Sequence, residues 1–143
     1  MTLAPSVVRK IILDEHELIK KKLEAIEALL GKKQDQALKN AVDEFGHYFL
    51  KHLATEEKYL RPALTTIDAW GPVRAEQLAQ EHIEQTRELK RLSSLVQEKR
   101  FAEYEKEIKL FVQAVYKDIE QENKDFLNAD VLKDDLITAG NCG

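Results

Sequence analysis

Two side chains with metal-binding chemistry, His52 and Glu56, lie four residues apart in a stretch that reads as a helix. At this spacing they share one helix face, with β-carbons roughly 6 Å apart. Apolar residues such as Phe49 and Leu60 continue the same face at helical spacing on either side. An ionised carboxylate removed from water is costly unless it is paired or binds a metal. His52 and Glu56 therefore require partners inside the protein core.

Further titratable residues occupy expected core positions in the other long helices. Each falls where the apolar stripe of its helix would otherwise place a large apolar side chain. Together with the first pair, the candidates are His16, His52, Glu56, His82, Asp118 and Glu122.

These polar core positions recur in an internal repeat. Shifting the chain by 66 residues places His16 on His82 and Glu56 on Glu122, while His52 falls on Asp118. The period is too long for short solenoid repeats and indicates two helical hairpins. A polar residue that entered one helix by chance would not be expected to recur together with the apolar stripe.

The elements that must position these residues are four long helices. Ser6 is expected to cap a first helix that runs to about Leu30, followed by Gly31. A second helix is expected from Asp35 to about Leu60, ended by Pro62. A third is expected to start at Pro72. After a polar break at Glu98, Lys99 and Arg100, a fourth is expected from Phe101 to Phe126.

Composition agrees with a helical protein. The 143 residues are 34% charged and 43% hydrophobic, with only five glycines and three prolines, which is typical of one mostly helical domain. The fold predicted is all-α: an up-down-up-down antiparallel four-helix bundle over residues 1–128. A tail over residues 129–143 has Val131, Leu132, Leu136 and Ile137 at helical spacing and is expected to form a short helix.

Charge and segment patterns exclude several functions. The net charge is −4, with both signs interspersed, so no nucleic-acid or membrane partner is predicted. No signal peptide or apolar run long enough to span a bilayer is evident, so we expect a cytoplasmic protein. The single cysteine, Cys142, cannot form an internal disulfide. The protein partner, if there is one, is not indicated.

The six candidates are expected to meet at one level of the bundle. At a rise of about 1.5 Å per residue, His16 and His82 lie roughly 15 Å into their helices, and His52 and Asp118 roughly 25 Å into helices that run the other way. Three imidazoles and three carboxylates suffice for a two-metal site, in which the metals lie about 3.5 to 4 Å apart. More than four nitrogen and oxygen donors without a thiolate favour iron or manganese over structural zinc.

The segment His52-Leu-Ala-Thr-Glu56-Glu57-Lys58-Tyr59-Leu60-Arg61-Pro62, with Glu15-His16 and Glu81-His82, resembles the hemerythrin-like, or HHE cation-binding, family. The resemblance extends from about Val8 to Phe126. It implies a four-helix bundle with a non-haem centre of two iron ions. By this resemblance, His16, His52 and His82 are nitrogen ligands, and Glu56 and Glu122 are bridging carboxylates. Members of the family carry or sense oxygen, respond to nitric oxide, or handle iron.

Two positions depart from the family pattern. The fourth helix, which usually reads HxxxE, has Asp118 before Glu122, and Thr86 stands where the oxygen carriers have a second histidine. A site richer in carboxylates stabilises higher-valent iron and favours oxygen or peroxide chemistry, or iron handling, over reversible oxygen carriage.

Three functions follow as alternatives. The first is a di-iron protein that binds or senses a small ligand such as oxygen, nitric oxide or peroxide. The second is a di-iron carboxylate enzyme that oxidises iron or reduces peroxide. The third is a helical module that binds zinc or no metal and works through protein contacts. Manganese is an alternative to iron in the first two.

Other polar residues near the candidates are set aside. His47 lies about 140° around the helix from His52 and is expected to face solvent. Glu15, Glu57 and Glu81 are expected on outer faces, with Glu81, beside Gln85, a weak candidate for the site.

Overall fold

The computed structural model describes residues 3–97 and 101–134, and these residues form helices and turns without a strand. The elements are α1 (Pro5–Leu29), α2 (Asp35–Thr55), the π-helix η1 (Glu56–Leu60), α3 (Arg61–Ile67), α4 (Gly71–Gln97) and α5 (Phe101–Asp125). The predicted all-α class is confirmed for this part of the chain. The polar break expected at 98–100 lies outside the described residues.

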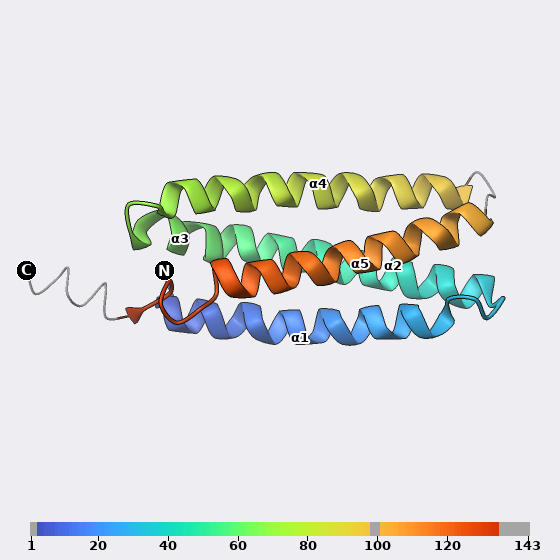
Figure 1. Ribbon diagram of the computed structural model, residues 1–143, viewed down its shortest axis with the longest axis horizontal. Helices are drawn as coiled ribbons and strands as arrows, with labels where there is room; N and C mark the ends of the chain where they lie inside the picture. The colour runs from blue at the N-terminus through green and yellow to red at the C-terminus, as the bar shows by residue number, and fades with distance from the viewer. Residues whose placement is uncertain (1–2, 98–100, 135–143) are drawn as a thin grey trace, which may run out of the picture.

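The four long helices lie side by side along the long axis of the molecule (Figure 1). The connection between α1 and α2 lies at one end, and α3 lies at the other end, close to the start of α1. Helix α1 contacts α2 and α5, and α4 contacts the same two helices, so the four form a closed ring. This arrangement is that of a helical bundle.

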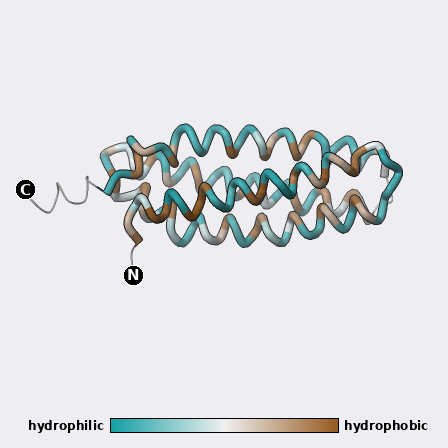
Figure 2. Tube along the Cα trace, turned by 90° about the horizontal axis from the view of Figure 1, so that it is seen from below, coloured by the Kyte–Doolittle hydropathy of each residue, from teal (hydrophilic) through white to brown (hydrophobic). Residues whose placement is uncertain are grey.

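The core consists of two apolar clusters separated by a layer of polar side chains. The buried faces of α1 and α4 cross all three levels, whereas α2 and α5 reach the second apolar cluster only through the residues that follow them, Leu60 of η1 and Phe126. In α1, for example, His16 lies between Ile12 of one cluster and Ile19 of the other. Figure 2 shows the hydrophobic and hydrophilic stretches alternating along each helix, as expected for helices with one buried face. The predicted stripes therefore identified the buried faces.

The start of α1 differs from the prediction. The helix begins at Pro5, which suits the first turn because it has no N–H to satisfy and a helical φ. Ser6 lies inside the helix, and its backbone N and hydroxyl donate hydrogen bonds of 2.9 and 2.5 Å to the Asp134 carboxylate. The residue predicted as an N-cap thus ties the chain segment after α5 to α1. Gly31, with φ +74°, follows the end of α1 as predicted.

The prediction that Pro62 ends the second helix is wrong. The helix continues through η1 into α3, so the connection before α4 is only residues 68–70. Proline cannot donate a hydrogen bond to the carbonyl four residues earlier, and its ring would clash with that carbonyl in a regular α-helix. The wider π turn accommodates it: the Arg61 N–H bonds to the carbonyl of Glu56, five residues back.

The tight entry into α4 requires a glycine. A β-carbon at Gly71 would lie 2.0 Å from the backbone oxygen of Leu64, so no side chain fits there. Asp68 fixes the turn, because its carboxylate accepts from the Trp70 N–H at 2.8 Å and from Arg74 at 2.9 Å.

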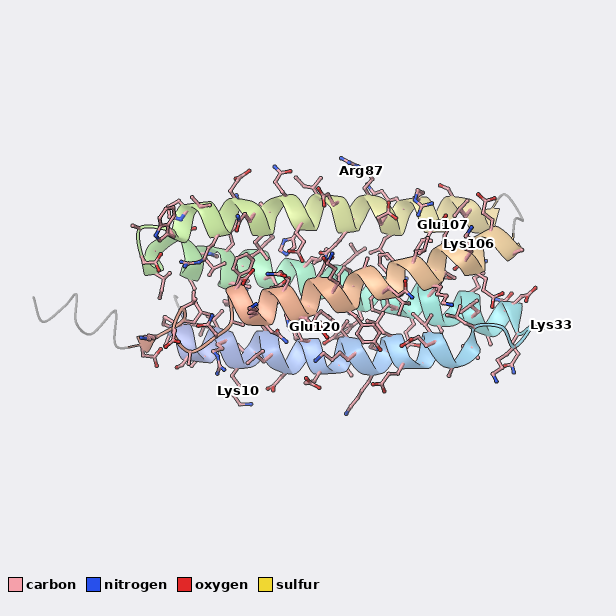
Figure 3. The ribbon with its side chains drawn as sticks, in the orientation of Figure 1. Lys10, Lys33, Arg87, Lys106, Glu107 and Glu120 are labelled. Carbon is pink, nitrogen blue, oxygen red and sulfur yellow. The ribbon has the colours of Figure 1, made fainter. Side chains whose placement is uncertain are left out.

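The chain after α5 packs back on the bundle. Leu127 and Leu132 are buried in the apolar cluster at the α3 end, while Leu136 and Ile137 of the expected tail helix lie outside the described residues. Charged side chains such as Lys10 and Arg87 project outward (Figure 3). Within residues 3–97 and 101–134, none of the helices has the length and apolar character needed to cross a bilayer.

Candidate metal centre

The polar layer brings five of the six predicted residues into the bundle interior. His16 comes from α1, His52 from α2, Glu56 from the first turn of η1, His82 from α4 and Glu122 from α5. Their exposed fractions are 1%, 3%, 1%, 6% and 4%. Polar groups at this depth need partners or a cation, because burial removes the water that would otherwise solvate them.

Glu56 lies at the centre of the layer. Its Oε1 is 3.1 Å from Nε2 of His52 and 3.0 Å from Nε2 of His82. Its Oε2 faces Nε2 of His16 at 3.8 Å, and that same nitrogen is 3.2 Å from Oε1 of Glu122. All three imidazoles therefore direct Nε2 toward the two buried carboxylates.

The opposite ring nitrogens are held from outside the layer. Nδ1 of His52 is 2.7 Å from Oε1 of Glu15, and Nδ1 of His82 is 2.8 Å from Oε1 of Glu57. Nδ1 of His16 is 2.6 Å from the side-chain oxygen of Asn123. Because these partners present acceptor oxygens, Nδ1 carries the proton and donates it, which leaves the Nε2 lone pair facing inward. Metal-binding histidines are commonly oriented in this way.

The outer partners share a feature of the sequence that was not used in predicting the site. Each is the direct neighbour of a residue in the polar layer: Glu15 precedes His16, Glu57 follows Glu56, and Asn123 follows Glu122. Each contacts the imidazole of an adjacent helix. The expectation that Glu15 and Glu57 belong to outer faces is therefore wrong, since both are half-buried and bonded to histidines. Their adjacency to candidate ligands was the available signal.

The π-helix helps to place two consecutive carboxylates on one imidazole. Glu56 contacts Nε2 of His82 while Glu57 accepts from its Nδ1. Glu57 is held in turn by Arg61, whose Nη1 lies 2.9 Å from Oε2. A π turn next to the site fits the frequent occurrence of such turns at functional sites.

Three polar atoms of the layer have no hydrogen-bond partner: Nε2 of His16, Oε2 of Glu56 and Oε1 of Glu122. Such orphaned buried atoms call for an explanation, and a bound cation is one. His16, His52, Glu56 and Glu122 each offer one donor atom, and these atoms all lie within 4.8 Å of one another. The donor set, two imidazoles and two carboxylates, fits a transition-metal ion such as iron, manganese or zinc.

The electrostatics of the layer show competition for protons. Burial opposes ionisation of Glu56, but the neighbouring Glu122 carboxyl and the charge of His52 hold the pKa of Glu56 well below the usual range. Burial and the charge of Glu56 raise the pKa of Glu122 well above its usual range. Burial alone would lower the pKa of His52, but Glu56 and Glu15 raise it to about 9. Protons thus occupy the places that a cation would take.

Asp118, the sixth predicted residue, is not brought into this group. It is half-buried, and its Oδ2 accepts a hydrogen bond of 3.1 Å from Nε2 of Gln85. Glu81, expected on an outer face, is half-buried and accepts a hydrogen bond of 3.1 Å from the same Gln85 nitrogen. Burial, with the charges of Asp118 and Glu56, raises the pKa of Glu81 to about 7. His47 is exposed, as predicted.

Comparison with known families gives one match. The model of the family described as Hemerythrin HHE cation binding domain matches residues 7–129, a range that includes the whole polar layer. Neither the curated proteins nor the solved structures gave a match.

Proposed function

The chain belongs to the hemerythrin HHE cation-binding domain family, and we propose that its polar layer binds two iron ions in a non-haem centre. His16, His52 and His82 would supply nitrogen ligands, and Glu56 and Glu122 would bridge the two ions. Manganese or zinc could occupy the same nitrogen and oxygen donors, because none of them is specific for iron.

One observation carries this proposal. Three imidazoles from three helices direct Nε2 at the two buried carboxylates Glu56 and Glu122, while each Nδ1 is bonded on the outside. A purely structural polar layer would use the imidazoles to satisfy every carboxylate oxygen. Here three inward atoms have no hydrogen-bond partner, and a cation would satisfy them all.

The proposed role is to bind or sense a small ligand such as oxygen, nitric oxide or peroxide. Iron would supply the affinity and the electrons for such ligands. The protein would hold the donors in place through Glu15, Glu57 and Asn123, and the apolar clusters on both sides would exclude water. An antiparallel up-down-up-down order and a single domain over residues 1–128 are part of the proposal, supported by the family match over residues 7–129.

A second candidate is a di-iron carboxylate enzyme that oxidises iron or reduces peroxide. The observation in its favour is the two extra half-buried carboxylates beside the layer, Glu81 and Asp118, which both accept a hydrogen bond from Gln85. Catalytic turnover of Fe²⁺ or peroxide would favour this candidate over a binding protein.

The proposal is tested by metal analysis of protein produced in iron-supplemented cells, with absorption spectra recorded before and after exposure to air. We expect about two irons per chain and a visible band that changes with the gas. His52→Ala should lose iron, whereas His47→Ala, which removes an exposed histidine of the same helix, should retain it. A folded wild-type protein that binds zinc alone, or no metal, would refute the proposal.

A further inference from the structure

A depression of about 490 Å³ lies beside His82, where α4 passes η1 and the start of α3. Glu57 of η1 and Arg61 of α3 line it, and their side chains are joined by a hydrogen bond of 2.9 Å. Glu57 also accepts from Nδ1 of His82, so this depression borders the polar layer. Its volume lies within the range of pockets that bind small molecules.

One face of α4 supplies the rest of the lining. Ala79 and Ile83 come first along this face, and the cations Arg87 and Lys90 follow at helical spacing. Ile83 is 51% exposed, and Arg87 extends into solvent at the rim (Figure 3). At a rise of about 1.5 Å per residue, Ile83 and Lys90 lie about 10 Å apart along the helix axis. The depression therefore offers an apolar surface next to positive charge.

The charge of this basic depression is opposite to that of the depression between α4 and α5. Arg61, Arg87 and Lys90 line the basic depression together with one carboxylate, that of Glu57. The other depression, of about 410 Å³, is lined by no basic residue and by four acidic ones, which are Glu76, Glu81, Glu84 and Asp118. The whole chain has a net charge of −4. Of the two depressions, the basic one is therefore suited to an anion.

The cations of the basic depression are largely free to bind a ligand. Arg61 pairs with Glu57, but the side chains of Arg87 and Lys90 have no ion pair or hydrogen bond with any residue that the structure describes. Arg91, one turn after Arg87 on the same helix, is instead paired with two glutamates at 2.9 and 2.7 Å. The N–H groups of two unpaired cations thus remain available to an oxyanion, which would accept charge-assisted hydrogen bonds from them.

We propose that the basic depression binds a small organic anion. A phosphate or carboxylate group of the ligand accepts hydrogen bonds from Arg61, Arg87 and Lys90. The apolar body of the ligand lies on Ile83 and Ala79. Arginine suits the first role, because the N–H groups of a guanidinium match two oxygens of a phosphate or carboxylate. This site adjoins the proposed metal centre but does not depend on iron.

The test is isothermal titration calorimetry of the metal-free protein with hexyl phosphate and with hexanoate. 1-Hexanol and inorganic phosphate serve as comparison ligands, because each lacks one of the two features that the depression recognises. We expect at least one of the two organic anions to bind, more weakly as the salt concentration rises, and 1-hexanol not to bind. Tighter binding of hexyl phosphate would identify a phosphate ester as the class of ligand, and tighter binding of hexanoate a carboxylic acid.

Variants place the binding in the depression. A chain with both Arg87→Gln and Lys90→Gln should bind the preferred anion about 4- to 25-fold more weakly, because one exposed charge pair contributes about 2- to 5-fold. The control is Arg91→Gln, which changes an exposed arginine of the same helix that does not line the depression and should bind as wild type. Circular dichroism checks that each variant is folded.

Several results would overturn the proposal. Folded wild-type protein that binds neither organic anion would do so, as would binding of 1-hexanol as tight as that of the anions. Inorganic phosphate that binds as tightly as hexyl phosphate would contradict the apolar part of the site. An equal loss of affinity in the Arg91→Gln control would contradict its location. Because the protein is free of metal, none of these results depends on whether the polar layer binds iron.

Discussion

Without metal, the protein should become less stable as the pH rises from 6 to 9. The pKa of His52 is raised from 6.5 to about 9 in the folded protein, so the stabilisation it provides is fully present below pH 6.5 and is lost as the pH passes 9. Across that interval the folded state holds one proton more than the unfolded state. The free energy of unfolding then falls by about 1.4 kcal/mol per pH unit, or about 3 kcal/mol in all.

Two carboxyls, Glu122 of the polar layer and Glu81 beside it, act in the same direction. The pKa of Glu81 is raised from 4.5 to about 7, and that of Glu122 is also raised, so their stabilising protons are lost with rising pH as well. A bound metal should reverse the trend, because metal ligands must be deprotonated to bind.

The assay is urea unfolding in the presence of a chelator at pH 6, 7, 8 and 9, followed by circular dichroism. His52→Gln should show a fall that is smaller by about 3 kcal/mol than that of wild type. His47→Gln, an exposed histidine of the same helix, should behave as wild type. A wild-type stability that is constant or rises over this interval, or the same fall in His52→Gln, would refute the reasoning.

Further predictions concern the supports of the site and the turn before α4. Glu15→Ala removes the acceptor for Nδ1 of His52 and should weaken metal binding about 10- to 100-fold without changing its stoichiometry, measured by competition with a chelator; unchanged affinity would show that this contact does not orient the ligand. Gly71→Ala should destabilise the fold by about 1 to 3 kcal/mol in urea unfolding, because the new methyl would meet the Leu64 carbonyl oxygen. Gly46→Ala, whose methyl would have only an ordinary contact, should stabilise it by up to about 1 kcal/mol, and equal effects of the two substitutions would contradict this account of the turn.

The polar layer could be predicted from the sequence because helical periodicity alone determines which residues share a face. His16, His52, Glu56, His82 and Glu122 all lie on buried stripes, and five such residues in one apolar core indicate a common site. The apolar residues of the two clusters lie on the same stripes, although their division into two clusters was seen only in the structure. These properties depend on spacing within one helix.

Contacts between helices could not be predicted in this way. Glu15 and Glu57 contact histidines on neighbouring helices because each helix is rotated about its own axis so that these side chains face the next helix. An apolar stripe in the sequence determines that rotation only to within a residue or two. Asp118 is half-buried and hydrogen-bonded to Gln85 on the neighbouring helix α4, a pairing that periodicity along α5 does not reveal. The continuation of the helix past Pro62 depends on a local π turn, for which periodicity gives no signal.

X-ray absorption spectroscopy of the iron-loaded protein would show whether two iron ions lie side by side in the polar layer. The account predicts a first coordination shell of nitrogen and oxygen without sulfur, and an iron–iron distance of about 3.5 to 4 Å. Isolated iron without a neighbouring metal, or iron bound by sulfur, would contradict it.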